Sequence, residues 1–274
     1  MQALRQIDDW PVDNVAAAVI DADGVVHTRG DQARRFRAAS IAKPITTWAC
    51  LIAAEEGIVT LDQAVGQPGC TLRHLLSHAG GYGFDGPDPI ARPERNRIYS
   101  NTGIELAAQT VADAAAIPFA GYLREAVLQP LGMASTELTS SPAHGMWLTA
   151  EDLTRFVVEA RSPSLISAAT AAESTTTIQF PALNGIIPGI GRYAPCPWGL
   201  GFEIRGGKNP HWTGATNSPS TFGHFGGAGT FAWVDPAVGV ASLALTDRPF
   251  DDWAEAALAL WPAFSDAVLD EASA

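Results

Sequence analysis

The predicted strands of this chain of 274 residues lie only toward its two ends, and this restricts the fold most. Near the amino end, the β-branched or small runs 15–22 and 25–28 flank Asp23-Gly24, a dipeptide typical of a tight hairpin. Toward the carboxyl end, four further runs have strand-like composition: residues 198–204, 221–224, 230–234 and 238–245. We therefore expect both ends of the chain to pair in one antiparallel sheet.

The intervening stretch is predicted to be helical and to contain no strand. Apolar residues recur at helical spacing in six segments of it: 40–56, 71–78, 102–116, 119–128, 149–160 and 164–174. Residues 181–197 are rich in glycine and proline and predict a loop. Residues 1–9 and 253–270 predict terminal helices that cover a face of the sheet.

The fold class that follows is α/β of the α+β type: an antiparallel sheet built from both chain ends, flanked by helices, with an inserted helical lobe. We expect a single domain over residues 1–274. The helical lobe would span approximately 60–190, and the sheet lobe 10–57 and 198–270. A cleft between the lobes is the natural place for a ligand.

Composition excludes several kinds of partner. The formal net charge is −12, from 17 basic and 29 acidic residues, and no basic run occurs, so we expect no nucleic acid. No segment approaches the roughly 18 apolar residues that span a bilayer, so no membrane association is expected. The amino terminus lacks a secretory pattern, which favours a cytoplasmic location.

A metal site is not expected either. The three cysteines, Cys50, Cys70 and Cys196, are too few and too scattered for a disulfide framework or a zinc site. His74 and His78 have the i, i+4 spacing of metal ligands, but no third ligand accompanies them.

Chemistry is first indicated by Ser40-Ile41-Ala42-Lys43 at the start of the 40–56 helix. Residues at i and i+3 are neighbours on a helix, so the hydroxyl of Ser40 and the amine of Lys43 share one face. A shielded lysine has a lowered pKa and can act as the base for a serine nucleophile. Alternatively, Ser40 caps the helix and Lys43 is an exposed first-turn residue, because S-x-x-K is short and common.

A second polar group, Tyr99-Ser100-Asn101, precedes the 102–116 helix. A phenol beside an ammonium could stay partly ionised and take the proton of Ser40. Asn101 offers a donor and an acceptor that could orient Lys43 and hold an amide of the substrate. The alternative is that Tyr99 packs in the core and Asn101 caps the helix.

The third group is the glycine-rich strand Gly223-His224-Phe225-Gly226-Gly227. Glycines weaken a strand unless something must approach its backbone closely. The N–H groups of Gly227 and Ser40 could together form an oxyanion hole. His224 could bind a carboxylate or polarise Tyr99, although a glycine bulge with a structural histidine is the plainer interpretation.

The three groups, in this order, resemble the serine β-lactamase and penicillin-recognising superfamily, closest to its class C β-lactamase, D,D-peptidase and family VIII esterase branch. That branch carries S-x-x-K, then Y-x-N, then K-T-G or a variant beginning with His or Trp. Here His224-Phe225-Gly226 stands where K-T-G would be. The stretch 75–81, LLSHAGG, also resembles a structural segment of the family. The similarity covers residues 15–265.

The resemblance implies an acyl-enzyme mechanism on a small-molecule ester, amide or lactam, without cofactor. Ser40 would attack the carbonyl, Lys43 and Tyr99 would move its proton, and the N–H groups of Ser40 and Gly227 would hold the oxyanion. His224 and Phe225 depart from the lysine and threonine of β-lactamases, which favours a less anionic ester or amide.

We therefore expect a serine hydrolase of esters or amides. The alternatives are a weak β-lactamase or D-amino-acid peptidase, and a non-catalytic ligand-binding protein with a vestigial site. The sequence does not indicate the oligomeric state.

Overall fold

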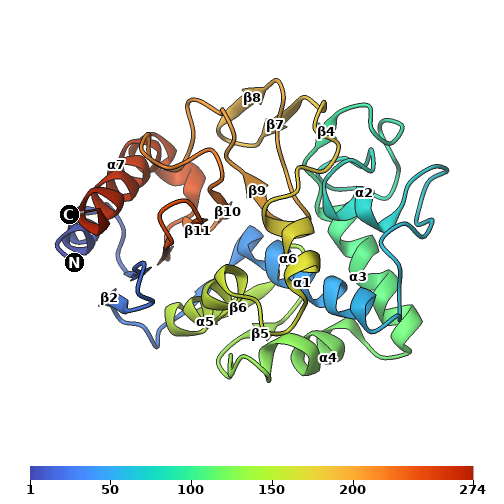
Figure 1. Cartoon of the computed structure of the whole chain (residues 1–274), viewed down its shortest axis with the longest axis horizontal. Helices are drawn as coiled ribbons and strands as arrows, with labels where there is room; N and C mark the ends of the chain where they lie inside the picture. Colours follow the sequence, from blue (N-terminus) through green and yellow to red (C-terminus); the bar gives the residue numbers. More distant parts are fainter. Residues whose placement is uncertain (274) are drawn as a thin grey trace.

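The computed structural model describes residues 1–273 (Figure 1). Strands from both chain ends form one six-stranded sheet in the order β2-β1-β12-β11-β10-β9. Every neighbouring pair in this sheet is antiparallel. Its strands are β1 (Val15–Ile20), β2 (Val26–Gly30), β9 (Glu203–Ile204), β10 (Phe222–Gly226), β11 (Thr230–Asp235) and β12 (Val240–Thr246). The pairing of β1 with β12 joins the two ends, so the predicted antiparallel sheet is confirmed.

Both faces of the sheet are buried because its strands alternate between two apolar clusters. In β1, Ala16 and Ala18 belong to a cluster shared with the middle of the chain, whereas Ala17 and Val19 face a second cluster rich in tryptophan and phenylalanine. This two-residue period is the expected consequence of the pleat. The resulting three-layer arrangement fixes the sheet between helices on either side.

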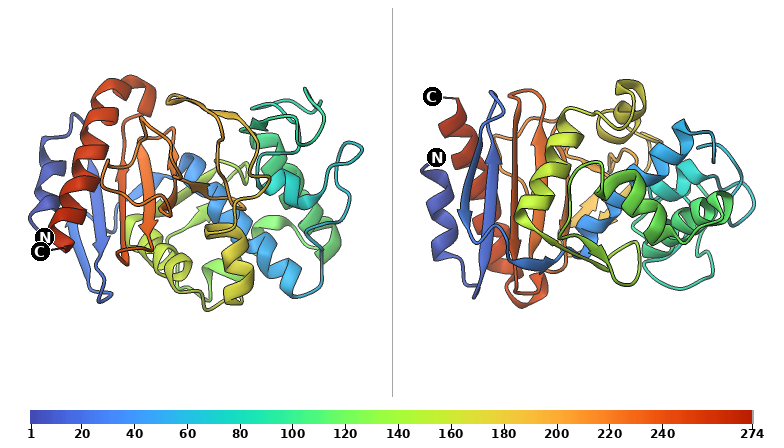
Figure 2. Two further views of the ribbon diagram at one scale, coloured as in Figure 1. Left: turned by 45° about the horizontal axis from the view of Figure 1, so that its top comes forward. Right: turned by 90° about the horizontal axis from the view of Figure 1, so that it is seen from below.

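The helices η1 (Ala3–Asp9) and α7 (Ala254–Ala272) cover one face, and α5 (Ala150–Arg161) packs on the other (Figure 2). The two termini lie side by side, where the Gln2 backbone N–H donates to Glu271 Oε1 at 2.7 Å. The predicted terminal helices and the hairpin around Asp23-Gly24 are therefore confirmed.

The rest of the chain is helical in the main, as predicted. Its helices are η2 (Ala39–Ile41), α1 (Ala42–Glu55), α2 (Leu72–Leu76), α3 (Asn101–Ala115), α4 (Phe119–Leu123), the π-helical η3 (Arg124–Leu128) and α6 (Ala168–Thr175), with η4 (Phe250–Asp252) preceding α7. The predicted 164–174 helix thus begins later than expected, after Ser167.

The expectation of a middle without strands is wrong. Two small three-stranded sheets occur there, ordered β3-β6-β5 and β4-β7-β8. Their strands are β3 (Arg35–Arg37), β4 (Arg97–Ile98), β5 (Glu137–Leu138), β6 (Met146–Thr149), β7 (Gly185–Ile187) and β8 (Gly191–Tyr193). They are too short to show a sequence period, and β7 and β8 lie inside the predicted 181–197 loop. Conversely, only two residues of the predicted 198–204 strand are regular, because Gly201 has a φ of 77°.

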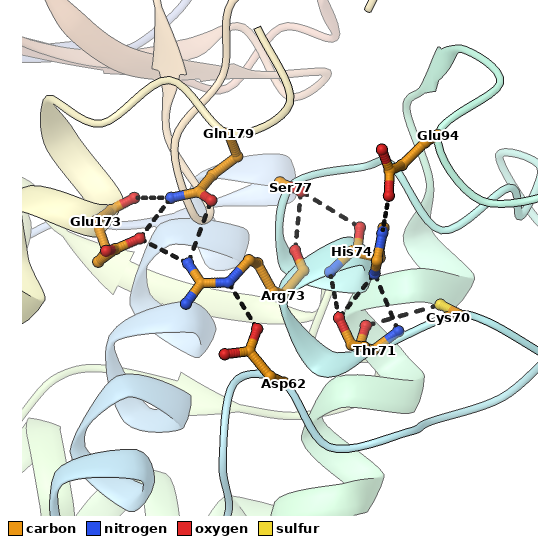
Figure 3. Close-up of polar contacts among 9 residues, drawn as sticks. All are labelled: Asp62, Cys70, Thr71, Arg73, His74, Ser77, Glu94, Glu173 and Gln179. Atoms are coloured by element: carbon orange, nitrogen blue, oxygen red, sulfur yellow. Dashed lines mark hydrogen bonds and ion pairs between the residues drawn. The ribbon is translucent and has the colours of Figure 1, made fainter.

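Helix α2 is held in place by polar contacts at both of its sides (Figure 3). Arg73 forms ion pairs with Glu173, at 2.6 Å, and with Asp62, at 3.0 Å. On the other side His74 contacts Glu94 at 3.1 Å, and its Nδ1 accepts the backbone N–H of Thr71. The residue that the i, i+4 spacing suggested as a metal ligand therefore belongs to a capping box at the start of this helix.

Within residues 1–273, no helix has the length and apolarity needed to cross a membrane.

Candidate active site

Ser40 lies in the first turn of a helix, at the floor of a cleft. The 3₁₀ turn η2 runs directly into α1, so the backbone N–H of Ser40 is among those without an intrahelical acceptor. The preceding Ala39 has a φ of 45°, a left-handed conformation that a residue with a side chain rarely adopts. This bend turns the half-buried Ser40 side chain toward the cavities.

Lys43 is fully buried beneath Ser40, with its Nζ within hydrogen-bond distance of three oxygen atoms. Its Nζ lies 3.1 Å from Ser40 Oγ, 2.6 Å from Asn101 Oδ1 and 3.1 Å from the carbonyl oxygen of Ala143. The alternative of an exposed first-turn lysine is therefore wrong.

The charge of Lys43 is destabilised by this environment. Burial lowers the pKa of Lys43 to about 7, with the more distant carboxylates of Glu105 and Asp85 opposing the shift. None of its three hydrogen-bond partners is an anion, so desolvation prevails. Near neutral pH a substantial fraction of Lys43 is consequently an uncharged amine with a lone pair directed into the site.

The Tyr99-Ser100-Asn101 segment meets Ser40 and Lys43 from the start of α3. Ser100, not Asn101, is the helix cap, because its Oγ accepts the N–H of Gly103 at 2.9 Å. Asn101 is thereby free to point inward. Its Oδ1 accepts from Lys43 and its Nδ2 donates to Asp85 Oδ1 at 3.0 Å, which fixes the orientation of the amide.

Tyr99 lies above Lys43, with the Nζ atom 4.7 Å from the centre of its ring. Burial raises the pKa of Tyr99 above its ordinary value, and a hydrogen bond with Ser40 only partly offsets this rise. The expectation that Lys43 keeps the phenol partly ionised is therefore wrong for the resting site. Tyr99 is a protonated phenol and can act as a proton donor.

His224 faces Tyr99 from strand β10 and is uncharged. Its Nδ1 lies 2.6 Å from the carbonyl oxygen of Phe225, and since a carbonyl only accepts, Nδ1 carries the proton. The Nε2 atom is then an acceptor for the Tyr99 hydroxyl, at the long distance of 3.4 Å. Burial, assisted by the nearby charge of Lys43, lowers the pKa of His224 to about 4.

Gly226 and Gly227 place the end of β10 against the serine. A Cβ on Gly226 would lie 2.6 Å from the Ala38 carbonyl oxygen and 3.1 Å from the Ser40 nitrogen, so only glycine allows this approach. Thr230 Oγ1 donates to the same Ala38 carbonyl at 3.0 Å. Gly227 instead borders open space, and within residues 1–273 no acceptor pairs with its N–H.

Two cavities open on Ser40 and share Phe84 and Gly227. The larger, of about 550 Å³, extends past Asn101 and Asp85 toward a group of arginines in and beside β3. The smaller, of about 170 Å³, extends past Tyr99 and His224 toward apolar and aromatic residues: Ile187, Pro188, Trp198, Phe225 and Phe250. Ser40 thus stands at the junction of two chambers, of which the larger is lined by arginines and the smaller by aromatic side chains.

All seven residues that the sequence singled out, Ser40, Lys43, Tyr99, Asn101, His224, Gly226 and Gly227, converge on this junction. Sequence reasoning missed three contributors. Asp85 holds Asn101 by accepting a hydrogen bond from its amide. His78, in the segment taken as structural, accepts the Ser100 N–H at 3.2 Å and packs on Tyr99 with ring centres 4.6 Å apart. The Ala143 carbonyl has no side-chain signal to reveal it.

Replacing Gly226 by alanine is expected to destabilise the fold, because the new methyl group meets backbone on two sides. Overpacking of this kind costs about 1–3 kcal/mol in the free energy of unfolding. The Gly227→Ala variant is the matched control, since open space faces that position. Chemical denaturation of both variants measures the difference, and equal stabilities would contradict the close packing of β10 on Ser40.

Comparison with known proteins agrees with this geometry. The chain matches the family model described as beta-lactamase over residues 11–263. It is 48% identical to a crystal structure described as a β-lactamase from Mycobacterium bovis, with a TM-score of 0.95, over 99% of this chain and 100% of that one. Simvastatin synthase from Aspergillus terreus, a mutant form, shares the fold at 17% identity, with a TM-score of 0.79 over 99% and 94% of the two chains.

A sequence match of 26% identity to penicillin-binding protein 4* of Bacillus subtilis covers 38% of this chain and 30% of that protein, so the chain spans less than a third of this relative. The family model and the relative from Mycobacterium bovis each extend over nearly the whole chain. The resemblance found in the three motifs is thus confirmed, and the chain belongs to the beta-lactamase family, with the fold of its serine hydrolases.

Proposed function

We propose that this protein hydrolyses an ester or amide of a small molecule through an acyl intermediate on Ser40. The proposal rests above all on one observation. The Nζ of Lys43 lies 3.1 Å from Ser40 Oγ, and burial lowers the pKa of Lys43 to about 7. A buried amine of this pKa, at this distance, can take the hydroxyl proton near neutral pH.

In the acylation step, Ser40 Oγ forms a bond with the carbonyl carbon while its proton passes to the neutral amine of Lys43. The N–H groups of Ser40 and Gly227 stabilise the negative charge that develops on the carbonyl oxygen. The carbonyl then re-forms, the bond to the leaving group breaks, and the Tyr99 hydroxyl protonates the departing atom. The phenolate of Tyr99 recovers its proton from the Lys43 ammonium.

Deacylation reverses these roles with water in place of the leaving group. A water molecule that enters the smaller cavity attacks the acyl carbon as its proton passes to the Tyr99 oxygen and the Tyr99 hydroxyl proton passes to the neutral Lys43 amine. The Lys43 ammonium then protonates Ser40 Oγ as the bond from that oxygen to the acyl carbon breaks. His224 is an acceptor for the Tyr99 hydroxyl and therefore orients it without carrying a charge of its own. Asn101 holds the Lys43 amine toward Ser40.

The nucleophile is tested by labelling. Incubation with a fluorophosphonate probe should add one covalent group to the peptide that contains Ser40, as read by mass spectrometry. The Ser40→Ala variant should lose both the label and ester hydrolysis while its melting temperature stays nearly unchanged, because Ser40 is only half-buried. Unlabelled protein would favour a non-catalytic binding protein, whereas full activity of the Ser40→Ala variant would exclude Ser40 as the nucleophile.

The base is tested by pH. Below pH 7 the Lys43 ammonium has no lone pair, so kcat/KM for a neutral ester should fall as the pH is lowered through about 7. Lys43→Arg should remove this inflection and lower kcat/KM by roughly 10²- to 10⁴-fold, because a guanidinium does not deprotonate. An unchanged profile in that variant would assign the inflection to another group.

Hydrolysis of β-lactams is a second candidate, favoured by the relative at 48% identity that is described as a β-lactamase. The uncharged His224 weighs against it, because a substrate carboxylate would find no cation at that position. Turnover of the cephalosporin nitrocefin, compared with that of 4-nitrophenyl butyrate, separates the two candidates. We expect the ester to be the better substrate.

A further inference from the structure

We propose that the preferred substrate carries an anionic group on its acyl side and a leaving group that is neutral or cationic. The inference rests on the proposed hydrolytic function and assigns a substrate class to it. It comes from the distribution of charged side chains between the two cavities that meet at Ser40.

The position of Tyr99 indicates which cavity takes which part of the substrate. A general acid must lie within hydrogen-bond reach of the atom that it protonates, so the leaving group departs on the side of Tyr99. Tyr99 lines the smaller cavity and not the larger one. The smaller cavity therefore receives the leaving group, and the acyl chain extends into the larger cavity.

Three arginines line the larger cavity, and one of them is free of a protein carboxylate. Arg34 lies 3.6 Å from Asp247, and Arg35 lies 3.0 Å from Glu137. Arg37, which follows on the same strand, has no ion pair among residues 1–273. A guanidinium can bind a carboxylate through two parallel hydrogen bonds, so Arg37 is suited to an anionic acyl group.

The acidic residues of the larger cavity are already engaged. Asp247 accepts from the backbone N–H and the side-chain Nδ2 of Asn14, at 2.9 and 2.6 Å, besides facing Arg34. Asp85 accepts from Asn101. Within residues 1–273, Arg37 is consequently the arginine of this cavity that has no ion pair with a protein carboxylate.

The smaller cavity has the opposite character. Its charged lining residues are Glu203 and Asp251, and no lysine or arginine lines it. The remaining titratable group that lines it, His224, directs the lone pair of Nε2 at the Tyr99 hydroxyl and donates its Nδ1 proton to the Phe225 carbonyl. An anionic leaving group would therefore meet carboxylates and find no cation.

Glu203 is held as an ionised, buried carboxylate by partners outside the cavity. It contacts Lys208 Nζ at 3.1 Å, His211 Nε2 at 2.9 Å and Trp212 Nε1 at 2.8 Å. Lys208 balances this charge, but its Nζ is fully buried, donates to the Pro197 carbonyl at 2.8 Å and does not line the cavity. The lysine therefore fixes Glu203 without offering a contact to a substrate.

The acyl side is tested with two 4-nitrophenyl esters that differ by one methyl group: the free-acid monoester of adipic acid and its methyl ester. We expect wild-type kcat/KM to favour the anionic ester by about five- to tenfold, and the ratio to fall with added salt. Arg37→Gln should bring the ratio near one. Arg92→Gln changes the net charge equally at an exposed position outside both cavities, and should keep the wild-type ratio.

The leaving side is tested with the butyrate esters of 3-hydroxyphenylacetic acid and of its methyl ester. In the free acid, a methylene group separates the carboxylate from the aromatic ring, so the charge has little electronic effect on the reacting oxygen. The wild type should favour the neutral leaving group by about fivefold. Glu203→Gln would leave the buried Lys208 ammonium without its carboxylate partner, so the exposed Asp251 is the better residue to substitute. Asp251→Asn should reduce that preference.

The outcomes separate the two proposals. Hydrolysis of all four esters with equal kcat/KM within each pair would overturn the charge assignment and leave the proposed hydrolase intact. A wild-type preference for the anionic acyl ester that persists in Arg37→Gln would also overturn it. Failure of every ester to react, together with an unlabelled Ser40, would instead overturn the hydrolase itself.

Discussion

The burial of one amine without an anionic partner is the constraint on which the site depends. Lys43 donates only to neutral oxygens, and each comes from a different part of the chain: its own helix, the start of α3 and the segment before β6. A buried charge without a partner is costly, and the cost appears as a lowered pKa. The sheet, the helical region and the cap at Ser100 all serve to bring these oxygens to one point.

The electrostatics of the neighbouring groups follow from the same low-dielectric environment. The phenol of Tyr99 remains protonated and His224 remains neutral, because burial disfavours the charged form of each. A lysine in place of His224 would add a second charge close to Lys43, where two ammonium groups would repel each other. Because the neutral His224 stands where K-T-G would place a lysine, Lys43 is the one lysine or arginine, within residues 1–273, of the hydrogen-bonded cluster around Ser40.

Much of the fold and the site could be predicted from the sequence because the informative residues have strong local signals. The hairpin at Asp23-Gly24 and the spacing of Ser40 and Lys43 depend on short-range geometry. The missed features depend on long-range contacts. Asp85 acquires its role from the Asn101 amide, 16 positions further along the chain, and Ala143 acts through its backbone carbonyl. The ionisation state of Tyr99 is set by desolvation, which no sequence motif indicates. Strand β7 pairs with β8, which follows it closely, and also with β4, which lies far earlier in the chain.

The larger apolar cluster has a consequence for motion. It runs without interruption from Ala16 in the sheet, through Trp48 in α1, to Tyr122 in α4. A hinge that opened the cleft would have to expose this shared interior to water, at about 25 cal/mol for each Å² of apolar surface. Separating the cleft walls at a hinge would therefore be costly in free energy, because both walls share this one apolar interior. The cluster thus couples the shape of the cavities at Ser40 to the stability of the whole fold.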